Sequence, residues 1–308
     1  MNNKKQIVLI VFGSILVGFL IGSAFQTSSQ YISFNFKNPT VSDISVQAQG
    51  AAPKMPVKLD FAGEDVPLKD IEVRERLDRE IIVNTFRHSS TLILLKRANQ
   101  WTPTLTKILK EQGIPEDFVY LSMAESDLSQ VSSPSNASGF WQFLKPTAIQ
   151  YGLIVNDEVD QRYDIEKSTY AACKYLKDSY DQLGSWTIAA AGYNMGMAGA
   201  GRQAKEQGSD NYYDLYLNSE TSRYVFRILA LKLIHSNPSH FDYLIEAPDL
   251  YEPYQFKEIP VSGSVNSWIS FAKQNGISYK ELRRHNPWIR STSMRNSANN
   301  TFIVKIPV

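Results

Sequence analysis

The sequence predicts a mainly α protein, in which a helical domain of about 170 residues is preceded by an apolar N-terminal segment and followed by a small α+β module. Three observations predict this organisation. Apolar residues recur at helical spacing from about residue 70 to residue 236, the first 26 residues contain a long uncharged run, and the chain closes on a strand-like run. We therefore expect four parts: a membrane anchor or signal segment (1–26), a flexible linker (27–68), the helical domain (69–245) and the small module (254–308).

The composition argues against several classes of protein. Lys and Arg number 32 and Asp and Glu number 31, so the net charge of +1 gives no reason to expect a nucleic-acid partner. The single cysteine, Cys173, excludes an intramolecular disulfide and a cysteine-based metal cluster. Because no two of the four histidines are spaced i, i+4, we do not expect a zinc site.

The N-terminal run is long enough to span a membrane. Ile7 to Phe25 are nineteen residues without a charge, which at about 1.5 Å per residue cover a hydrocarbon layer of about 30 Å. We favour an uncleaved anchor, because the apolar core of a signal peptide usually has about 7–15 residues. A signal peptide cleaved near Gly22-Ser23-Ala24 is the alternative. With Lys4 and Lys5 held inside, the rest of the chain is expected on the periplasmic side of the cytoplasmic membrane, and the polar linker would hold the helical domain away from the bilayer.

Local signals predict where the helices of the domain begin and end. Thr102 followed by Pro103 is typical of a helix start, and Gly113 and Gly184 are typical of helix ends. The run from Pro115 to Asp117 is expected to open a helix with acids in its first turn. The expected helices cover Val73–Leu95, Thr102–Gly113, a segment starting at Pro115, Lys167–Leu183, Trp186–Ala191 and Ser222–Ile234.

Glu125 is the residue that departs from this pattern. Phe118, Leu121, Glu125 and Leu128 are spaced 3, 4 and 3, so they share one helix face and the carboxylate lies within the apolar stripe. A carboxylate buried without a partner is costly, so such a group is usually paired, protonated or functional. A carboxyl whose pKa is raised by an apolar pocket suits general-acid catalysis near neutral pH. The alternative is a half-exposed helix with Glu125 as an ordinary surface residue.

Three further segments combine small, aromatic and polar residues in ways that suit ligand binding. The first, Ser138 to Phe143, offers a glycine for close backbone approach, aromatic rings for stacking and the Gln142 amide for hydrogen bonding. The second, Ala189 to Gly196, is a run of small residues that ends with a tyrosine and an asparagine. The third, Glu220 to Tyr224, precedes an apolar helix and would bury a phenol whose hydroxyl needs a partner. Taken singly, each segment is explained by packing.

Taken together and in order, these segments resemble the soluble-lytic-transglycosylase family (glycoside hydrolase family 23), and within it the membrane-bound subgroup. The resemblance runs from about residue 70 to residue 238. Phe140, Gly192 and Gln161 depart from the residues usual in the family, and none of them is the acid. The matching segments are Glu125-Ser126-Asp127-Leu128, Gly139-Phe140-Trp141-Gln142, Asp160-Gln161-Arg162-Tyr163-Asp164, Gly192-Tyr193-Asn194-Met195-Gly196 and Glu220-Thr221-Ser222-Arg223-Tyr224-Val225.

The resemblance implies a lysozyme-like helical fold and cleavage of the MurNAc–GlcNAc β-1,4 bond of peptidoglycan. It makes Glu125 the catalytic acid and then the base. Ser126, Gln142 and Asn194 would contact the sugar or its N-acetyl group, and Tyr193 and Tyr224 would position the carboxyl and the glycan. The expected substrate-binding set is completed by Gly139, Phe140 and Trp141.

The residues themselves point to a mechanism with one carboxylate. Most glycosidases use two acids that flank the bond, whereas Asp127 is expected about 200° around the helix from Glu125. Glu125 would then protonate the glycosidic oxygen and deprotonate the muramoyl C6 hydroxyl, so that a 1,6-anhydro end forms without water. Such a reaction needs no metal and no cofactor, and we expect neither. Two alternatives stay open: a hydrolytic muramidase that uses the same glutamate, and a non-catalytic peptidoglycan-binding protein.

The C-terminal segment resembles a LysM module. Two short helices are expected, Val265–Asn275 and Ser278–His285, followed by Asn286-Pro287-Trp288 and a closing strand at Phe302–Pro307. The usual first strand is not evident, and Ile259-Pro260-Val261 is the candidate for it. Glycan binding and a purely structural role are both open for this module. The expected partners of the chain are peptidoglycan strands and, through the N-terminal helix, the membrane, and we expect a monomer.

Overall fold

The computed structural model describes residues 52–308. The predicted anchor or signal segment (1–26) and most of the predicted linker (27–68) lie outside the described residues. Within the described residues, no helix combines the length and the apolar character needed to cross a membrane.

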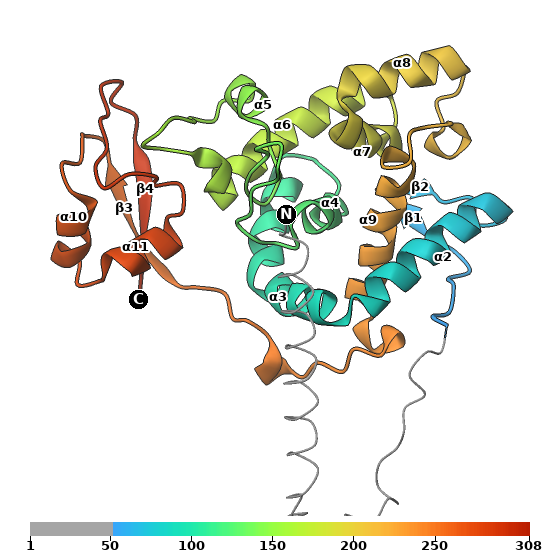
Figure 1. Cartoon of the computed structure of the whole chain (residues 1–308), viewed down its shortest axis with the longest axis horizontal. Coiled ribbons are helices and arrows are strands. Elements are labelled where there is room, and N and C mark those ends of the chain that lie inside the picture. The colour runs from blue at the N-terminus through green and yellow to red at the C-terminus, as the bar shows by residue number, and fades with distance from the viewer. Residues whose placement is uncertain (1–51) are drawn as a thin grey trace, which may run out of the picture. The chain divides into compact units, whose positions relative to one another are not determined.

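The domain that carries the predicted site is helical (Figure 1). Helix α9 runs along α2 and also packs against α4 and α7, and α3 packs against α4 and α6. The α-helices are α2 (Ile71–Phe86), α3 (His88–Glu111), α4 (Phe118–Ser126), α5 (Lys145–Gln150), α6 (Ile165–Leu183), α7 (Trp186–Met195), α8 (Met197–Gln207) and α9 (Thr221–Ser236). Short 3-10 turns lie at η2 (Gln161–Tyr163), η3 (Tyr212–Asp214), η4 (Pro238–Phe241) and η5 (Ala247–Asp249).

Several helix ends follow directly from local sequence. Asp70 caps α2, because its carboxylate accepts a hydrogen bond from the Glu72 amide at 2.8 Å. Gly184 ends α6 in the left-handed conformation, with φ of 72°. Ser185 then caps α7 at once by accepting from the Ile188 amide. The sharp turn between α6 and α7 therefore needs only two residues.

Two predicted helix boundaries are wrong. The expected helix at Thr102-Pro103 is part of α3, which begins at His88 and contains Pro103 in its interior. The expected Val73–Leu95 helix is in fact split at Arg87 between α2 and α3. Interior proline costs about 3 kcal/mol, but α3 buries leucine side chains on both sides of Pro103, Leu95 and Leu105 among them, so the packing keeps the helix continuous.

The end of the predicted linker is wrong as well. Strands β1 (Asp60–Phe61) and β2 (Glu64–Asp65) pair there as a small hairpin. The linker carries apolar anchors into the core of the helical domain, and the Glu64 carboxylate accepts hydrogen bonds from the Trp186 and Thr187 amides at the start of α7, at 2.6 and 2.9 Å. The buried anchors are Leu59, Phe61, Val66 and Leu68. Residues 59–68 thus belong to the folded domain.

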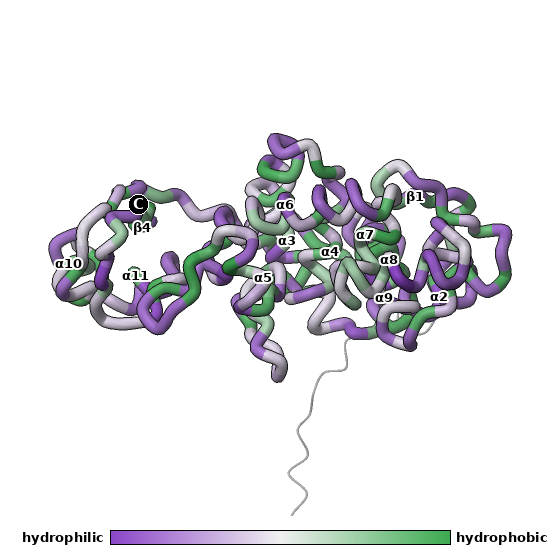
Figure 2. The backbone as a smooth tube through the Cα atoms, turned by 90° about the horizontal axis from the view of Figure 1, so that it is seen from above, coloured by the Kyte–Doolittle hydropathy of each residue, from purple (hydrophilic) through white to green (hydrophobic). Residues whose placement is uncertain are grey.

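The C-terminal module pairs β3 (Phe256–Val261) with β4 (Phe302–Pro307) in antiparallel register, from Phe256 opposite Pro307 to Val261 opposite Phe302. Helices α10 (Trp268–Gln274) and α11 (Tyr279–His285) complete it. Apolar and polar stretches alternate along its backbone, as they do along the helices of the larger domain (Figure 2). Its buried residues form an apolar cluster separate from that of the helical domain, and Val159 of the helical domain joins this second cluster.

Candidate active site

Glu125 lies in the last turn of α4. The helix ends at Ser126, because Asp127 turns into the left-handed conformation with φ of 48°. Phe118 and Leu121 are fully buried on the same helix, whereas Glu125 is half-buried. Leu128 is buried too, but it lies beyond the end of the helix, so the predicted apolar stripe continues into the turn. The short helix therefore holds the carboxyl at the edge of the core.

Burial makes the Glu125 carboxyl a weak acid. It raises the pKa from 4.5 to about 7, although the hydrogen bond from the Tyr224 hydroxyl and the charge of Arg227 act in the opposite direction. Tyr224 and Arg227 are one turn apart on α9, which packs against α4. The phenol of Tyr224 is itself buried, and Glu125 is the partner that its hydroxyl needs. The site therefore holds a carboxyl that is partly protonated at neutral pH.

The segment from Ser138 to Phe143 is fixed to α4 and α7 through its backbone. The Ser126 hydroxyl donates to the Phe140 carbonyl at 2.9 Å, and the Tyr193 hydroxyl donates to the Trp141 carbonyl at 2.7 Å. Gly139 has φ of 80°, and a β-carbon there would lie 1.9 Å from the carbonyl oxygen of Arg162. The glycine is thus required by close approach to the chain's own backbone.

The side chains of this segment do not lie as predicted. The rings of Phe140 and Trp141 are buried in the core, and the Trp141 indole donates to the Thr169 hydroxyl at 2.9 Å, so neither ring is free to stack on a ligand. The Gln142 amide nitrogen donates to the Gly139 carbonyl at 2.8 Å and to the Val131 carbonyl at 3.1 Å. The packing of the loop thus uses groups that were expected to bind a ligand.

Side-chain hydrogen bonds also join Asn194, at the end of α7, to the start of α9. The Asn194 amide donates to the Glu220 carboxylate at 3.1 Å, and its oxygen accepts from the Thr221 hydroxyl at 2.8 Å. Tyr193 precedes Asn194 at the end of α7, and the pKa of its phenol is raised, first by burial and then by the charge of Glu125. The three predicted segments are therefore brought together near the Glu125 helix, largely by hydrogen bonds to Ser126 and among themselves.

A cleft of about 380 Å³ opens beside Glu125. Its polar lining includes Asp127, whose carboxylate binds Arg87 at 2.9 Å. The expectation that Asp127 lies far around the helix is therefore wrong, since α4 ends before it and the turn brings it into the same cleft. Of the predicted residues, only Glu125 and Ser126 are among the lining, which also comprises Ser90, Ile93, Arg97, Ala124, Ser129, Val131 and Arg227.

Two charged residues near the acid, Arg227 and Glu80, are not among the predicted site residues. Arg227 lines the cleft, and its Nε lies 4.0 Å from Oε2 of Glu80. Glu80 is a buried carboxylate on α2, bound at 2.6 Å by Arg223. The signal was present, because Glu80 falls three residues after Leu77 and next to Ile81 in an apolar stripe, as Glu125 does in its own helix. Within residues 52–308 no group of three or more His, Cys, Asp or Glu side chains is placed to hold a metal ion.

Among known proteins, this chain is similar to lytic transglycosylases. Curated relatives are the membrane-bound lytic murein transglycosylase D proteins of Escherichia coli strains K12 and CFT073, each 27% identical over 243 residues. The match covers 76% of this chain and 52% of the relative, so the chain spans about half the length of these proteins. A solved structure that matches is an inactive mutant of the lytic transglycosylase Slt from Pseudomonas aeruginosa, with 20% identity, a TM-score of 0.37, and coverage of 49% of this chain and 26% of that one.

Two family models match within the described part of the chain. Residues 104–216 match the family described as Transglycosylase SLT domain. Residues 257–308 match the family described as Soluble lytic transglycosylase C-terminal LysM-like domain. The first match contains Glu125 and the segments around residues 140 and 193, and the second coincides with the β3–β4 module. The mainly helical part of this chain therefore matches a transglycosylase SLT domain, and the small C-terminal module matches a LysM-like domain; the two parts are called the SLT domain and the LysM-like domain after these matches.

Proposed function

We propose that this protein is a lytic transglycosylase that cleaves the MurNAc–GlcNAc β-1,4 bond of peptidoglycan and forms 1,6-anhydro-MurNAc ends. The observation that supports this most is the Glu125 carboxyl. It is held by Tyr224, it lines an open cleft, and its pKa is raised to about 7 by burial. A carboxyl that is partly protonated at neutral pH is matched to general-acid catalysis. The relatives, named as lytic murein transglycosylases, support the substrate class.

In the proposed reaction Glu125 acts twice. It first donates its proton to the glycosidic oxygen as the bond to C1 of MurNAc breaks, and the GlcNAc unit leaves with that proton. The carboxylate then removes the proton of the muramoyl C6 hydroxyl, and the C6 oxygen bonds to C1. The acid is regenerated and no water is consumed. The hydrogen bond from Tyr224 stabilises the carboxylate between the two steps.

The other predicted site residues are assigned supporting roles in this proposal. Ser126 and Tyr193 hold the carbonyls of Phe140 and Trp141, so that the 138–143 loop keeps a fixed position against α4. Asn194 ties α7 to the start of α9, which carries Tyr224. These residues would position the acid and the glycan through the backbone they hold. Gln142 and Tyr193, which are partly exposed, remain the candidates for sugar contact.

A hydrolytic muramidase is the second candidate, and one observation favours it. Asp127 lines the same cleft as Glu125, so a second carboxylate is available to orient a water molecule. Against this, the ion pair with Arg87 holds the Asp127 carboxylate on the α3 side of the cleft. The lyase is therefore the preferred reaction.

Digestion of purified peptidoglycan sacculi tests both candidates. The full chain is expected to release muropeptides with 1,6-anhydro ends, which mass spectrometry separates from reducing ends by the mass of one water. Glu125→Gln is expected to abolish release and to keep the fold, and a variant that retains a tenth of wild-type turnover would contradict the role of Glu125. Asp127→Asn is the matched control: it should retain the anhydro product, whereas its inactivation together with reducing ends in the wild type would favour the hydrolase.

We further propose that the protein works on the periplasmic face of the cytoplasmic membrane. The support is the uncharged run from Ile7 to Phe25 after two lysines, together with the membrane-bound name of the relatives. Fractionation of membranes after alkaline washing tests it, since an uncleaved anchor keeps the protein in the membrane pellet.

A further inference from the structure

Three cavities that begin with the cleft at Glu125 follow one another along α3, and a fourth lies beyond them at Thr104. Each cavity shares lining residues with the next: Arg97 borders the first and second, and Gln100 and Trp101 border the second and third. Their volumes are about 380, 720 and 430 Å³. The residues of α3 that line the series, together with its N-cap residue Arg87, are spaced mostly three or four apart, as one helix face requires: Arg87, Ser90, Ile93, Arg97, Gln100, Trp101 and Thr104.

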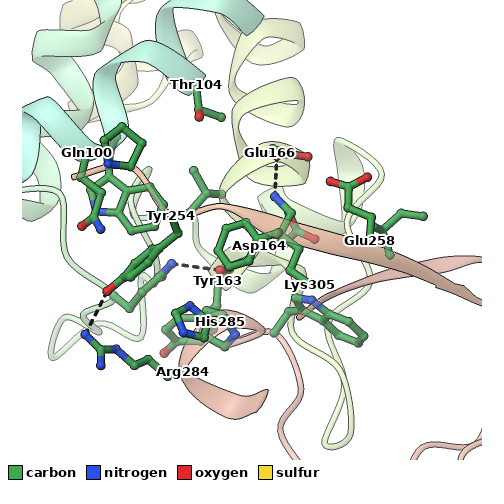
Figure 3. Close-up of a pocket in the computed structure, with 18 residues that line it drawn as sticks. Gln100, Thr104, Tyr163, Asp164, Glu166, Tyr254, Glu258, Arg284, His285 and Lys305 are labelled. Carbon is green, nitrogen blue, oxygen red and sulfur yellow. Dashed lines mark hydrogen bonds and ion pairs between the residues drawn. The ribbon is translucent and has the colours of Figure 1, made fainter. Parts of the chain in front are cut away.

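The third cavity, here called the far cavity, lies where α3 meets the LysM-like domain (Figure 3). Aromatic rings from both domains line it. Trp101 of α3 lies 6.0 Å from Tyr254, measured between ring centroids, and Tyr254 lies 4.6 Å from the His285 ring. Aromatic side chains offer an apolar face together with a polar edge, and a saccharide ring presents C–H groups on one face and hydroxyls around its rim. The rings therefore suit a sugar.

The polar groups of the far cavity suit a ligand rich in hydroxyls. The pKa of His285 is lowered, chiefly by burial, so its neutral ring offers one donor and one acceptor. The Gln130 side-chain oxygen is buried and has no hydrogen-bond partner among the described residues, while its nitrogen donates to the Tyr163 carbonyl at 3.0 Å. Glu258 is an exposed carboxylate on the rim.

The charges of the far cavity argue against an anionic ligand. Asp164, Glu166 and Glu258 line it with Arg284 and Lys305, so carboxylates outnumber the permanent cations. Lys305 is paired with Glu166, and Arg284 donates to the Tyr254 hydroxyl at 2.9 Å. Both cations are thus engaged within the protein, as Figure 3 shows. A neutral saccharide would bind here without charge repulsion, whereas the carboxylates of the cavity would repel the free carboxylates of a stem peptide.

We propose that the far cavity is a remote subsite that holds N-acetylated sugar units of the same glycan strand whose linkage lies at Glu125. The strand would follow α3, from Arg87 to Thr104, a length of about 25 Å at 1.5 Å per residue. This inference rests on the proposed function. The glycan strand would then contact the LysM-like domain as well as the SLT domain. The enzyme would cleave long strands, which reach the far cavity, in preference to short fragments.

The test compares two substrates in the full-length protein. Peptide-free glycan strands and a tetrasaccharide of the same repeat are digested by the wild type, Tyr254→Ala and Glu258→Ala, and the ratio of kcat/KM for long over short substrate is measured. Loss of one aromatic or polar contact is expected to lower this ratio about three- to tenfold. Tyr216→Ala is the matched control, because Tyr216 is 86% exposed and lines none of the three cavities; its ratio should equal that of the wild type.

A binding measurement separates failure of this inference from failure of the proposed function. With Glu125→Gln as background, the dissociation constant of peptide-free strands should rise by a similar factor when Tyr254→Ala or Glu258→Ala is added. This can be measured even if the wild type cleaves nothing. Equal ratios and equal binding in both variants, with melting temperatures like that of the wild type, would overturn the subsite. An effect confined to peptide-bearing strands would also overturn it, in favour of a stem-peptide pocket.

Discussion

At the residue scale, the environment of Glu125 sets the pH range of the proposed reaction. The acid must be protonated to attack the glycosidic bond, and its pKa is raised to about 7 by burial. We therefore expect kcat/KM to be highest on the acidic side of neutrality and to fall as pH rises through about 7. The pH profile of muropeptide release measures this, and a profile that keeps rising to pH 9 would contradict the assignment.

Tyr224 allows the same profile to be shifted in a known direction. Its hydrogen bond lowers the pKa of Glu125 against the effect of burial. In Tyr224→Phe the carboxylate loses that donor, so the alkaline limb should move to higher pH while the maximal rate falls. A limb that stays in place would mean that the hydrogen bond does not favour the ionised form.

The raised pKa of Glu125 should also make the stability of the protein depend on pH. The pKa of Glu125 is about 4.5 in the unfolded chain and about 7 in the folded one. The free energy of unfolding should therefore fall as pH rises between these two values, because the unfolded chain ionises more readily. Glu125→Gln removes this cost. The variant should be more stable than the wild type by about 1–3 kcal/mol at pH 8 and nearly equal to it at pH 4. Urea unfolding at the two pH values tests this, and equal stability at pH 8 would show that the carboxylate is solvated.

The sequence predicted Glu125 as the acid, but it did not predict which side chains surround the carboxyl in the cleft. The physical reason differs between Glu125 and its neighbours. Glu125 is detectable because a charged residue interrupts an apolar helix face. Arg227 carries no such signal, since its contact with Glu80 and with the cleft depends on how α9 lies against α2. The rings of Phe140 and Trp141 show the same limit, because the sequence motif does not tell which side of the loop faces the core.

At the scale of elements, the close approach at Gly139 yields a sharp prediction. A β-carbon at this position would lie 1.9 Å from the Arg162 carbonyl oxygen, and φ of 80° is itself unfavourable for other residues. Gly139→Ala should cost about 2–4 kcal/mol of unfolding free energy. The control is Gly152→Ala, which has φ of 90° but no atom within 4 Å of the added carbon, and should cost about 1–2 kcal/mol. Equal costs in thermal unfolding would show that the contact relaxes.

The helices and strands were predictable where residues next to their ends determine where they begin or stop. Gly184 and Ser185 separate α6 from α7 as expected, and the closing strand Phe302–Pro307 is β4 without change. Prediction failed where tertiary packing outweighs a local signal. Pro103 lies inside α3, and the hairpin at residues 60–65 folds because Phe61 and Leu68 find a core and Glu64 finds the start of α7. The start of α7 lies more than a hundred residues from Glu64, and Phe118, which packs on Phe61 at 5.2 Å between ring centroids, lies on another helix of the domain.

At the scale of the whole molecule, the SLT and LysM-like domains are held by the backbone as well as by side chains. The Asp160 amide donates to the Trp288 carbonyl at 2.9 Å, and the Arg290 amide donates to the Glu158 carbonyl at 2.8 Å. Lys305 adds an ion pair with Glu166 across the same boundary. These contacts keep the far cavity lined from both sides, so a remote subsite depends on the two domains staying docked.

Val159 provides the test of this docking. Its side chain belongs to the helical domain in sequence but packs in the apolar cluster of the LysM-like domain, where it is 3% exposed. Val159→Ala removes both buried γ-methyl groups, which should cost about 1–2 kcal/mol, and the loss falls on the boundary. The amides of Asp160 and Arg290 should then exchange hydrogen faster together, while those of α6 keep their protection. Val57→Ala is the control, since Val57 is 99% exposed. If both boundary amides already exchange fast in the wild type and Val159→Ala changes neither rate, the domains do not stay docked in solution, and the glycan path along α3 would then end at Trp101.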